Sequence, residues 1–347
     1  MTTEAFSEKA MRDLSAMTTV LMASVGDRAG LFKALASGGP ATSKELSERA
    51  GVSERYVREW YGAMVHAGYL QWDPTTQRAT LPEAYVPVLA TEGQLHSMGG
   101  NYQWAVAVSK TTDELVRAFR TGEGIAQDSF DENLALGIER SSAAMYEHLL
   151  VDEWIAAVPS VKERLEKGVS VADVGCGGGR ALIELAKEFP NSRYVGFDIF
   201  GPAVESARAN ARRAGVDDRV SFQEIDATKP LPDQFDVILS FDVVHDVSDP
   251  VAMLRSVRSG LRPEGIYVMV EPTGFESIEE VPPDPMRALQ YAASLLYCLP
   301  VSLTGSGKGL GATGVTVSKV EELSKAAGFG GVRRVGASFM SVFELRR

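Results

Sequence analysis

The sequence predicts an α/β protein in which an N-terminal winged-helix domain precedes a doubly wound parallel sheet. Two observations carry this prediction: a helix-turn-helix pattern in the first quarter of the chain, and a regular alternation of short β-rich runs with helical stretches after residue 168. With 347 residues, of which 45% are hydrophobic, the chain is long enough to bury two cores. A disordered or fibrous protein is therefore excluded.

Composition also limits the partners. The 46 acidic and 35 basic side chains give a formal net charge of −11, which provides no overall attraction to nucleic acid or anionic lipid. No apolar run approaches the ~18 residues that span a bilayer, and the N-terminus is acidic, so we expect a cytoplasmic protein. Cys176 and Cys298 lie far apart and the four histidines are scattered singly, which favours reduced thiols and no metal site.

The winged-helix prediction comes from residues 41–81. Residues 41–70 contain two helical periods joined by a short turn, with Ser43 and Ser53 at the positions expected of N-caps. Residues 69–81 then alternate as two short strands, which is typical of a wing. We assign residues 1–90 to this domain.

Helical spacing continues through residues 91–167, which we interpret as a helical connector. In residues 168–347 short strands alternate with helices, and this alternation predicts a parallel sheet with helices on both faces. The strands are expected at 169–174, 193–198, 220–224, 235–241, 266–271, 332–335 and 339–345, and the helices at 181–189, 202–214, 251–261, 284–303 and 318–327.

A glycine-rich loop follows the first of these strands. Asp173, Gly175, Gly177 and Gly179 stand in D-x-G-x-G-x-G spacing. A dinucleotide-binding fingerprint needs a small residue at the position held by Arg180, which disfavours a nicotinamide cofactor. The compact loop instead suits a nucleoside that carries no pyrophosphate.

Two further carboxylates are expected at neighbouring strand ends. Asp198 closes the second strand, where a carboxylate can accept both ribose hydroxyls, and Asp226 with its neighbour Ala227 follows the third strand, beside the expected position of the base. Since the carboxyl ends of parallel strands share one edge of a sheet, these positions converge on the glycine loop. Taken singly, each feature is also explained by a tight turn or a capped helix.

The fourth and fifth strands supply residues for proton transfer. His245 lies just beyond the strand 235–241, and Glu271 ends the next strand. A histidine there can accept a proton from a bound nucleophile, while a carboxylate within reach fixes its tautomer. A phenol has a pKa only about 3.5 units above that of imidazole, so phenols and enols are favoured over alcohols. The alternative is a capped loop histidine.

The glycine loop and the two strand-end aspartates together resemble class I S-adenosylmethionine-dependent methyltransferases, over roughly the second half of the chain. The resemblance implies a Rossmann-like, seven-stranded sheet that binds S-adenosylmethionine and releases S-adenosylhomocysteine. It places the three glycines under the methionine and ribose, Asp198 on the ribose and Asp226 on the adenine. Phe241 stands where these enzymes often carry a cofactor-lining lysine.

The winged helix, the connector and the HDxxD segment that starts at His245 are similar to those of small-molecule O-methyltransferases of bacterial and plant secondary metabolism. That resemblance implies that His245 is the general base, that Glu271 flanks it and that the N-terminal domain forms a homodimer. Besides Phe241, one departure is evident: the position of a second flanking acid falls near Gly314.

Four residues are candidates for substrate contacts: Tyr146 and His148 in the connector, Asp246 beside His245, and Tyr291 in the apolar helix 284–303. An interface histidine and a plain core helix are the alternatives. Asp246 and Asp249 could also be considered as metal ligands, but Asp249 precedes a proline at a helix start and is better explained as an N-cap.

We therefore expect transfer of a methyl group from S-adenosylmethionine to a small aromatic or polyketide-like acceptor. Two alternatives stay open: a ligand-sensing winged-helix transcription regulator, and an enzyme of the same fold with a non-methyl reaction. The first 100 residues hold 11 acidic and 9 basic side chains, which disfavours a nucleic-acid partner.

Overall fold

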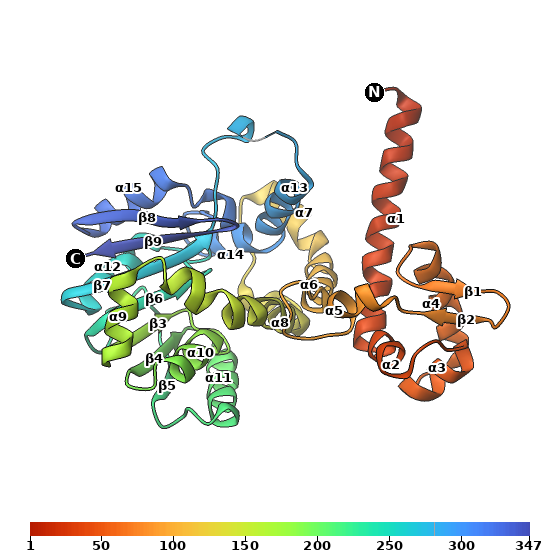
Figure 1. Ribbon diagram of the computed structural model, residues 1–347. Helices are drawn as coiled ribbons and strands as arrows, with labels where there is room; N and C mark the ends of the chain where they lie inside the picture. The colour runs from red at the N-terminus through yellow and green to blue at the C-terminus, as the bar shows by residue number, and fades with distance from the viewer. Residues whose placement is uncertain (281) are drawn as a thin grey trace. The chain divides into compact units, whose positions relative to one another are not determined.

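The computed structural model describes residues 1–280 and 282–347 and divides into two compact units (Figure 1). Unit 1 comprises Met1–Lys110 and Asp131–Met145, and unit 2 comprises Thr111–Phe130 and Tyr146–Arg347. The chain therefore passes between the units three times. No helix of the described residues combines the length and the apolar content that a membrane span requires.

Unit 1 has the expected winged helix. Phe32 and Trp60 pack edge to face in its core, with ring centroids 5.1 Å apart, beside the buried Leu46 and Met64. The two short strands form an antiparallel wing. Its elements in the first 110 residues are α1 (Thr3–Arg28), α2 (Leu31–Gly38), α3 (Ser43–Ala50), α4 (Glu54–His66), β1 (Gln71–Asp73), β2 (Arg78–Thr80), η1 (Glu83–Tyr85), α5 (Val86–Leu89) and α6 (Gly99–Ser109).

The cap of α3 differs from the prediction. Thr42, not Ser43, is the N-cap: its hydroxyl accepts from the Glu45 amide at 3.3 Å, and the Glu45 carboxylate accepts from the Thr42 amide at 2.9 Å. This reciprocal pair satisfies two amides that the helix leaves unbonded. Ser43 is the first helical residue, and its hydroxyl donates to Glu54. Ser53 occupies the N-cap position of α4 without a side-chain cap bond.

Unit 2 is built on a seven-stranded sheet with the order β5-β4-β3-β6-β7-β9-β8, which confirms the predicted Rossmann-like sheet. The first five strands in the chain run parallel; Val171, for example, pairs with Tyr194 on one side and Val237 on the other. The last two strands form a hairpin, so β9 is antiparallel to both of its neighbours. The strands are β3 (Ser170–Val174), β4 (Arg193–Asp198), β5 (Val220–Glu224), β6 (Phe235–Phe241), β7 (Leu261–Pro272), β8 (Gly331–Ala337) and β9 (Met340–Arg346).

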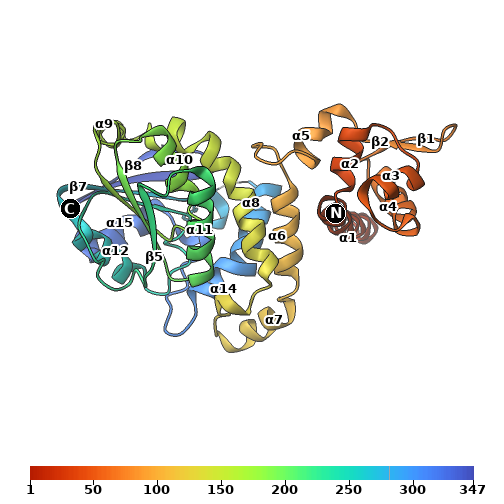
Figure 2. The same cartoon turned by 90° about the horizontal axis from the view of Figure 1, so that it is seen from below.

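Helices cover both faces of this sheet (Figure 2). From the central strands β3 and β6 the chain moves outward in opposite directions, and right-handed crossovers then place the connecting helices on opposite faces. One layer holds α10 (Arg180–Glu188) and α11 (Gly201–Ala214), and the other holds α12 (Pro250–Gly260) and α15 (Val317–Ala327). The strand order reverses between β3 and β6, and ligands of such sheets bind at that point.

The remaining helices include two π-helical turns that the periodicity did not predict. The expected helix 284–303 is helical almost throughout, but its middle, η5 (Ser294–Cys298), is a π-turn. Pro300, which has no amide proton to donate to the helix, follows two residues later. The other elements are α7 (Thr112–Thr121), η2 (Gln127–Ser129), α8 (Glu132–His148), the π-turn η3 (Leu150–Ile155), α9 (Pro159–Lys167), η4 (Ile278–Glu280), α13 (Pro285–Ala293), α14 (Leu299–Ser302) and η6 (Ala312–Gly314).

Candidate active site

The glycine loop turns immediately after β3. Gly175, Gly177 and Gly179 all have positive φ, at 78°, 48° and 75°. A Cβ on Gly175 would lie 2.5 Å from the Val243 side chain, and one on Gly179 would lie 2.5 Å from the Phe222 ring. At Gly177 a Cβ would meet nothing within 4 Å. The outer glycines are therefore required by packing, whereas Gly177 faces open space.

Asp198, at the end of β4, is bonded to this loop. One of its carboxylate oxygens accepts from the Gly177 amide at 2.8 Å, and the other accepts from the Phe200 amide at 2.9 Å. Burial raises the pKa of Asp198 even though these amides favour the charged form. Each oxygen keeps a further lone pair for a ligand. The carboxylate thus fixes the loop and remains able to accept hydroxyl donors.

Asp173 is the buried acid at the start of the motif. It is 1% exposed, and its Oδ1 has no hydrogen-bond partner. Burial, with a smaller contribution from the Asp198 charge, raises the pKa of Asp173 to about 8. A buried carboxylate oxygen without a donor is costly, so this position suits a ligand that brings a donor or a positive charge.

The third predicted carboxylate is engaged locally. Asp226 accepts from the Thr228 hydroxyl at 2.6 Å and from the Thr228 amide at 3.0 Å, and it pairs with Lys229 at 3.3 Å. Ala227 packs against the core of unit 2. Both residues follow β5, at the edge of the sheet that also carries Asp198. Their role in cofactor binding stays a prediction.

An aromatic cluster borders the same strand ends. Phe241, the last residue of β6, stacks on Trp154 with ring centroids 5.7 Å apart and an interplanar angle of 29°. Tyr146 meets both rings edge-on. Burial, followed by the charges of Asp173 and Asp242, raises the pKa of Tyr146 well above its usual value. The structure thus brings together Phe241 and Tyr146, which were predicted separately, with Trp154 as an additional member.

His245 and Glu271 form a buried pair. Nδ1 of His245 lies 2.5 Å from Oε2 of Glu271, and the two residues are 1% and 0% exposed. The other Glu271 oxygen accepts from the amides of Val243 and Val244, at 3.0 and 2.7 Å. Because Oε2 of Glu271 accepts at Nδ1, the proton of the neutral imidazole is held on Nδ1 and the lone pair is on Nε2.

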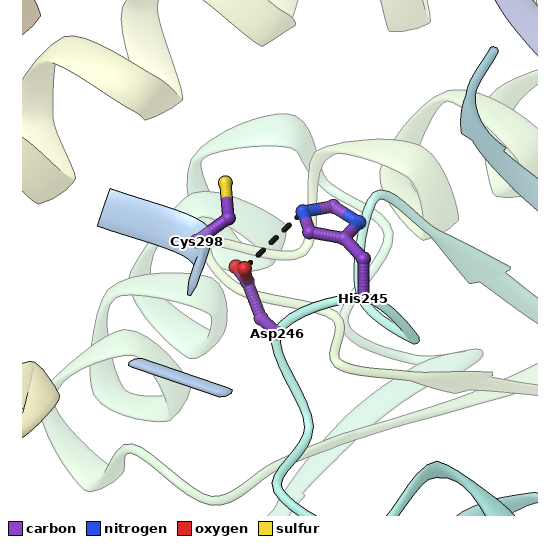
Figure 3. Close-up of side chains that lie close together, drawn as sticks. All are labelled: His245, Asp246 and Cys298. Carbon is purple, nitrogen blue, oxygen red and sulfur yellow. Dashed lines mark ion pairs between the residues drawn. The ribbon is translucent and has the colours of Figure 1, made fainter. Parts of the chain in front are cut away.

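Three other groups surround Nε2. Asp246 Oδ1 lies 3.2 Å from Nε2 without hydrogen-bond geometry, and Asp242 Oδ1 lies at 3.7 Å. The Cys298 thiol, from the π-turn η5, completes the group within 4.8 Å of both His245 and Asp246 (Figure 3). Asp242 has φ of 61°, a conformation uncommon outside glycine, where the chain turns sharply after β6.

These charges change the protonation of the group. Burial alone would lower the pKa of His245, but the carboxylates of Asp246 and Glu271 outweigh it and raise that pKa well above 6.5. Burial raises the pKa of Asp246 to about 6 although His245 opposes the shift, and burial with Asp246 raises the pKa of Cys298 to about 12. Cys298 is therefore a thiol.

Only some of the predicted substrate residues lie at the strand ends that carry His245 and the aromatic cluster. Asp246 and Tyr146 lie there, as described above. Tyr291 on α13 is 38% exposed, and His148 is exposed at the last residue of α8. By contrast, Tyr297 is buried, and its ring packs against Phe130 at 5.1 Å. Substrate contacts by Tyr291 and His148 stay a prediction.

The glycine-rich segment 304–314 is attached to the histidine loop. The Gly311 amide donates to the His245 carbonyl at 3.1 Å, and the Lys308 amide donates to the Ser248 carbonyl at 3.0 Å. Asp249 accepts from the Ala252 amide at 3.0 Å, which confirms it as the N-cap of α12. These backbone bonds hold the loop that carries His245.

Comparison with known proteins defines the class. Residues 165–297 match the family model of a methyltransferase domain, and residues 16–91 match that of an Rv2258c-like winged HTH domain. The first match contains the glycine loop, His245 and Glu271. The chain therefore carries an N-terminal winged-helix domain and a Rossmann-like methyltransferase domain, as its sequence predicts.

Individual relatives match only part of the chain. The 27-O-demethylrifamycin SV methyltransferase of Amycolatopsis mediterranei (strain S699) is 29% identical over 181 residues, which are 49% of this chain and 64% of that protein. The chain spans less than two thirds of the length of the curated relatives that it matches first.

Solved structures share the whole fold. The mitomycin 7-O-methyltransferase MmcR has a TM-score of 0.74 at 19% identity, covering 99% of this chain and 98% of its own. NcsB1, an O-methyltransferase from neocarzinostatin biosynthesis solved with S-adenosylmethionine and 2-hydroxy-5-methyl naphthoic acid, has a TM-score of 0.66 at 20% identity, covering 97% of each chain. At this identity the likeness shows the fold.

Proposed function

We propose that the chain is an S-adenosylmethionine-dependent methyltransferase that methylates an oxygen of a small molecule, preferably a phenolic or enolic hydroxyl of an aromatic or polyketide-like metabolite. The observation that carries the proposal is the buried His245–Glu271 pair, at the strand ends that also hold the glycine loop. The names of the rifamycin relative and of NcsB1 support an oxygen acceptor in natural-product synthesis.

The residues of the loop fit this cofactor. Asp173 has a buried oxygen without a donor, Gly177 faces open space, and Asp198 retains lone pairs for hydroxyl groups. Asp226 and Ala227, after the next strand, are the candidates for the adenine, and Phe241 for one wall of the site. S-adenosylmethionine supplies an electrophilic methyl group on a positively charged sulfur.

His245 acts as the base in this proposal. With its Nδ1 proton held by Glu271, Nε2 accepts the proton of the acceptor hydroxyl while the oxygen attacks, and the carboxylate then stabilises the imidazolium. An unperturbed imidazole is about 3.5 pKa units weaker than a phenolate, roughly 5 kcal/mol. Asp246 and Glu271 raise the pKa of His245 and so reduce this gap.

The same shift sets the pH dependence. A histidine accepts a proton only in its neutral form, and raising its pKa extends the range in which it is already protonated. The rate should therefore rise with pH through values above 6.5, the ordinary pKa of histidine. In the aromatic cluster Trp154 and Phe241 are buried and Tyr146 is partly exposed, so Tyr146 is the ring against which a planar acceptor can be positioned.

Charge pairing in unit 1 argues against a DNA-binding regulator. On α4, Arg55 pairs with Glu59 and Arg58 pairs with Glu54, each at 2.7 Å, and Arg78 in the wing pairs with Glu45 at 2.6 Å. Phosphate contacts need cations that are not already neutralised.

We also propose a homodimer formed through unit 1. On α1 the exposed Phe6, Leu14, Met17 and Val25 fall within an arc of about 100° at 100° per residue. The stripe continues into a hollow of about 440 Å³. The hollow is lined by residues of α1, of the turn that follows it and of α6: Leu21, Met22, Ser24, Val25, Arg28, Ala29 and Val106. Such an apolar face is typical of a protein interface.

The test of the enzymatic proposal separates binding from turnover. Labelled S-adenosylmethionine is incubated with a panel of phenols, enols and alcohols, products are identified by mass spectrometry, and cofactor affinity is measured by calorimetry. Asp198→Ala should abolish cofactor binding. His245→Asn should lower kcat by at least about 100-fold with cofactor affinity within a few-fold of the parent.

Three results would count against this scheme. Unchanged cofactor affinity in Asp198→Ala would refute the cofactor site, and full turnover in His245→Asn would refute the base. Methylation of nitrogen or carbon acceptors alone would refute the oxygen acceptor. Asp249→Asn is the matched control, because Asp249 lies in the same loop but caps α12 instead of facing the imidazole.

A further inference from the structure

We propose that His245, Asp246 and Cys298 form a binding site for a single Zn²⁺-like cation, and that occupation of this site turns methyl transfer off. The three side chains converge from the loop after β6 and from the π-turn η5 (Figure 3). Their candidate ligand atoms all lie within 4.8 Å of one another. The inhibitory part of the proposal rests on the proposed role of His245 as base, whereas the binding part does not.

The ligand set and spacing suit zinc. Zn²⁺ prefers imidazole nitrogen, thiolate sulfur and carboxylate oxygen in tetrahedral arrangement, which puts ligand atoms about 3.3–3.6 Å apart. Nε2 of His245 and Oδ1 of Asp246 already stand 3.2 Å apart. The Cys298 sulfur has to approach by at most about 1.5 Å to complete three ligands, which a side-chain rotation provides.

The histidine is oriented for a metal. Nδ1 faces Glu271 at 2.5 Å, and Glu271 is in turn held by two backbone amides. This carboxylate–histidine arrangement is the one that fixes the ring and raises the basicity of metal-ligating histidines. It also selects Nε2 as the ligand atom. The cation therefore belongs on the Asp246 and Cys298 side of the ring and not between His245 and Glu271.

The charge at this position supports a cation. Asp242, Asp246 and Glu271 each form an ion pair with His245, and none of the three pairs with a lysine or arginine among residues 1–280 and 282–347. Oδ1 of Asp246 is buried without a hydrogen bond. Three carboxylates around one imidazole leave excess negative charge, which a divalent ion would neutralise.

Metal binding and catalysis exclude each other. When Zn²⁺ binds, the Cys298 S–H bond breaks and a sulfur–zinc bond forms, and the thiol proton leaves to the buffer together with any proton carried by His245 Nε2. The lone pair of His245 Nε2 is then occupied by the metal and cannot accept a proton from the acceptor. A fourth coordination position remains for water.

The binding test uses the full-length protein stripped of metal with a chelator. Zn²⁺ titration by calorimetry should give one ion per chain, with proton release seen as a dependence of heat on buffer. Co²⁺ should give a sulfur-to-cobalt charge-transfer band. Cys298→Ser should remove this band and weaken zinc binding more than about 100-fold, since even changes outside the ligand set cost 10–100-fold. Cys176→Ser is the matched control and should retain both.

Activity provides the second arm. Zn²⁺ should inhibit the parent reversibly at the concentrations that saturate the calorimetric site, and Cys298→Ser should resist inhibition relative to its own metal-free rate. Failure to bind zinc, or equal binding by Cys298→Ser, would overturn the site, and activation by bound zinc would overturn its inhibitory role. If no acceptor is methylated, the cobalt band still decides on the site, so the failures of the two proposals are distinguishable.

Discussion

Two buried carboxylates, Asp173 at the end of β3 and Glu271 at the end of β7, have opposite hydrogen-bonding environments. Glu271 accepts from two amides and faces a histidine nitrogen, so both of its oxygens are engaged. Asp173, equally buried, has an oxygen with no donor and a pKa raised to about 8 by burial. Glu271 is thus a fixed orienting group. Ionisation of Asp173, by contrast, destabilises the folded protein when no ligand is bound.

This difference predicts how stability depends on pH. An acid whose pKa is raised by folding stabilises the fold fully below its ordinary value and loses that contribution as pH rises through the folded value. For Asp173 the loss extends from about pH 4 to about pH 8. At ~1.4 kcal/mol per unit this approaches ~5–6 kcal/mol. The free energy of unfolding of the parent should therefore fall relative to that of Asp173→Asn over this range, in denaturant titrations without cofactor.

Saturating S-adenosylmethionine provides the control. A cation beside Asp173 favours its ionised form, so the difference between parent and Asp173→Asn at pH 8 should shrink when the cofactor is bound. Parallel pH profiles for the two proteins without cofactor would contradict the raised pKa.

At the scale of the element, the glycine loop separates packing from binding. Gly175→Ala meets Val243 at 2.5 Å in addition to positive φ and should cost about 2–4 kcal/mol of stability. Gly177→Ala pays only the backbone term, about 1–2 kcal/mol, but places a methyl group in the open space assigned to the cofactor. We therefore expect the larger fall in Tm for Gly175→Ala. For Gly177→Ala we expect the larger loss of cofactor affinity relative to its fall in Tm.

Thermal unfolding and calorimetry on the same two variants check this pair. The reverse ranking, with Gly177→Ala the less stable and Gly175→Ala the weaker binder, would contradict the assignment of Gly175 to packing and Gly177 to cofactor binding.

Most strands and helices of unit 2 were predictable because each is a short apolar run bounded by turn residues. Four of the five parallel strands are found within one residue of the expected bounds, whereas β7 begins at Leu261, five residues before the expected start at 266. The antiparallel edge was not predicted, because alternation of strands and helices says nothing of the direction in which the final hairpin inserts. The cap at Thr42 was readable from the T-x-x-E spacing to Glu45.

The site was predictable wherever a residue lies at, or just beyond, the carboxyl end of a strand. Asp198, His245 and Glu271 all occupy such positions, and the parallel sheet brings them to one edge. Asp242 directly follows β6 and was not predicted, although it stands in the same FDVVHD run as His245. Cys298 carried no signal, because it lies 53 residues after His245 in a helix whose π-turn and placement depend on tertiary packing.

At the scale of the whole molecule, the apolar stripe on α1 predicts the oligomeric state. Leu14→Glu with Met17→Glu puts two charges into the proposed dimer interface, and loss of two apolar contacts of about 1 kcal/mol or more each weakens association at least about 30-fold. Sedimentation equilibrium should show a dimer for the parent and a monomer for this variant at micromolar concentration.

Ala16→Glu with Thr19→Glu is the matched control. It adds the same charge to another side of α1. Counted from Phe6 at 100° per residue, the stripe spans 0–100°, whereas Thr19 lies at about 220° and Ala16 at about 280°. This variant should remain dimeric. A monomeric parent, or dissociation by both variants, would contradict an interface on the stripe.

The route of the chain limits how the protein can be divided. Because Thr111–Phe130 belongs to unit 2 while Asp131–Met145 returns to unit 1, α8 starts in one unit and finishes in the other. A single cut, at residue 91 or at residue 168, therefore leaves one fragment short of part of its own packing. Exchanging the acceptor specificity of two such proteins by recombination would need three junctions in register, and chimaeras made with one should express poorly.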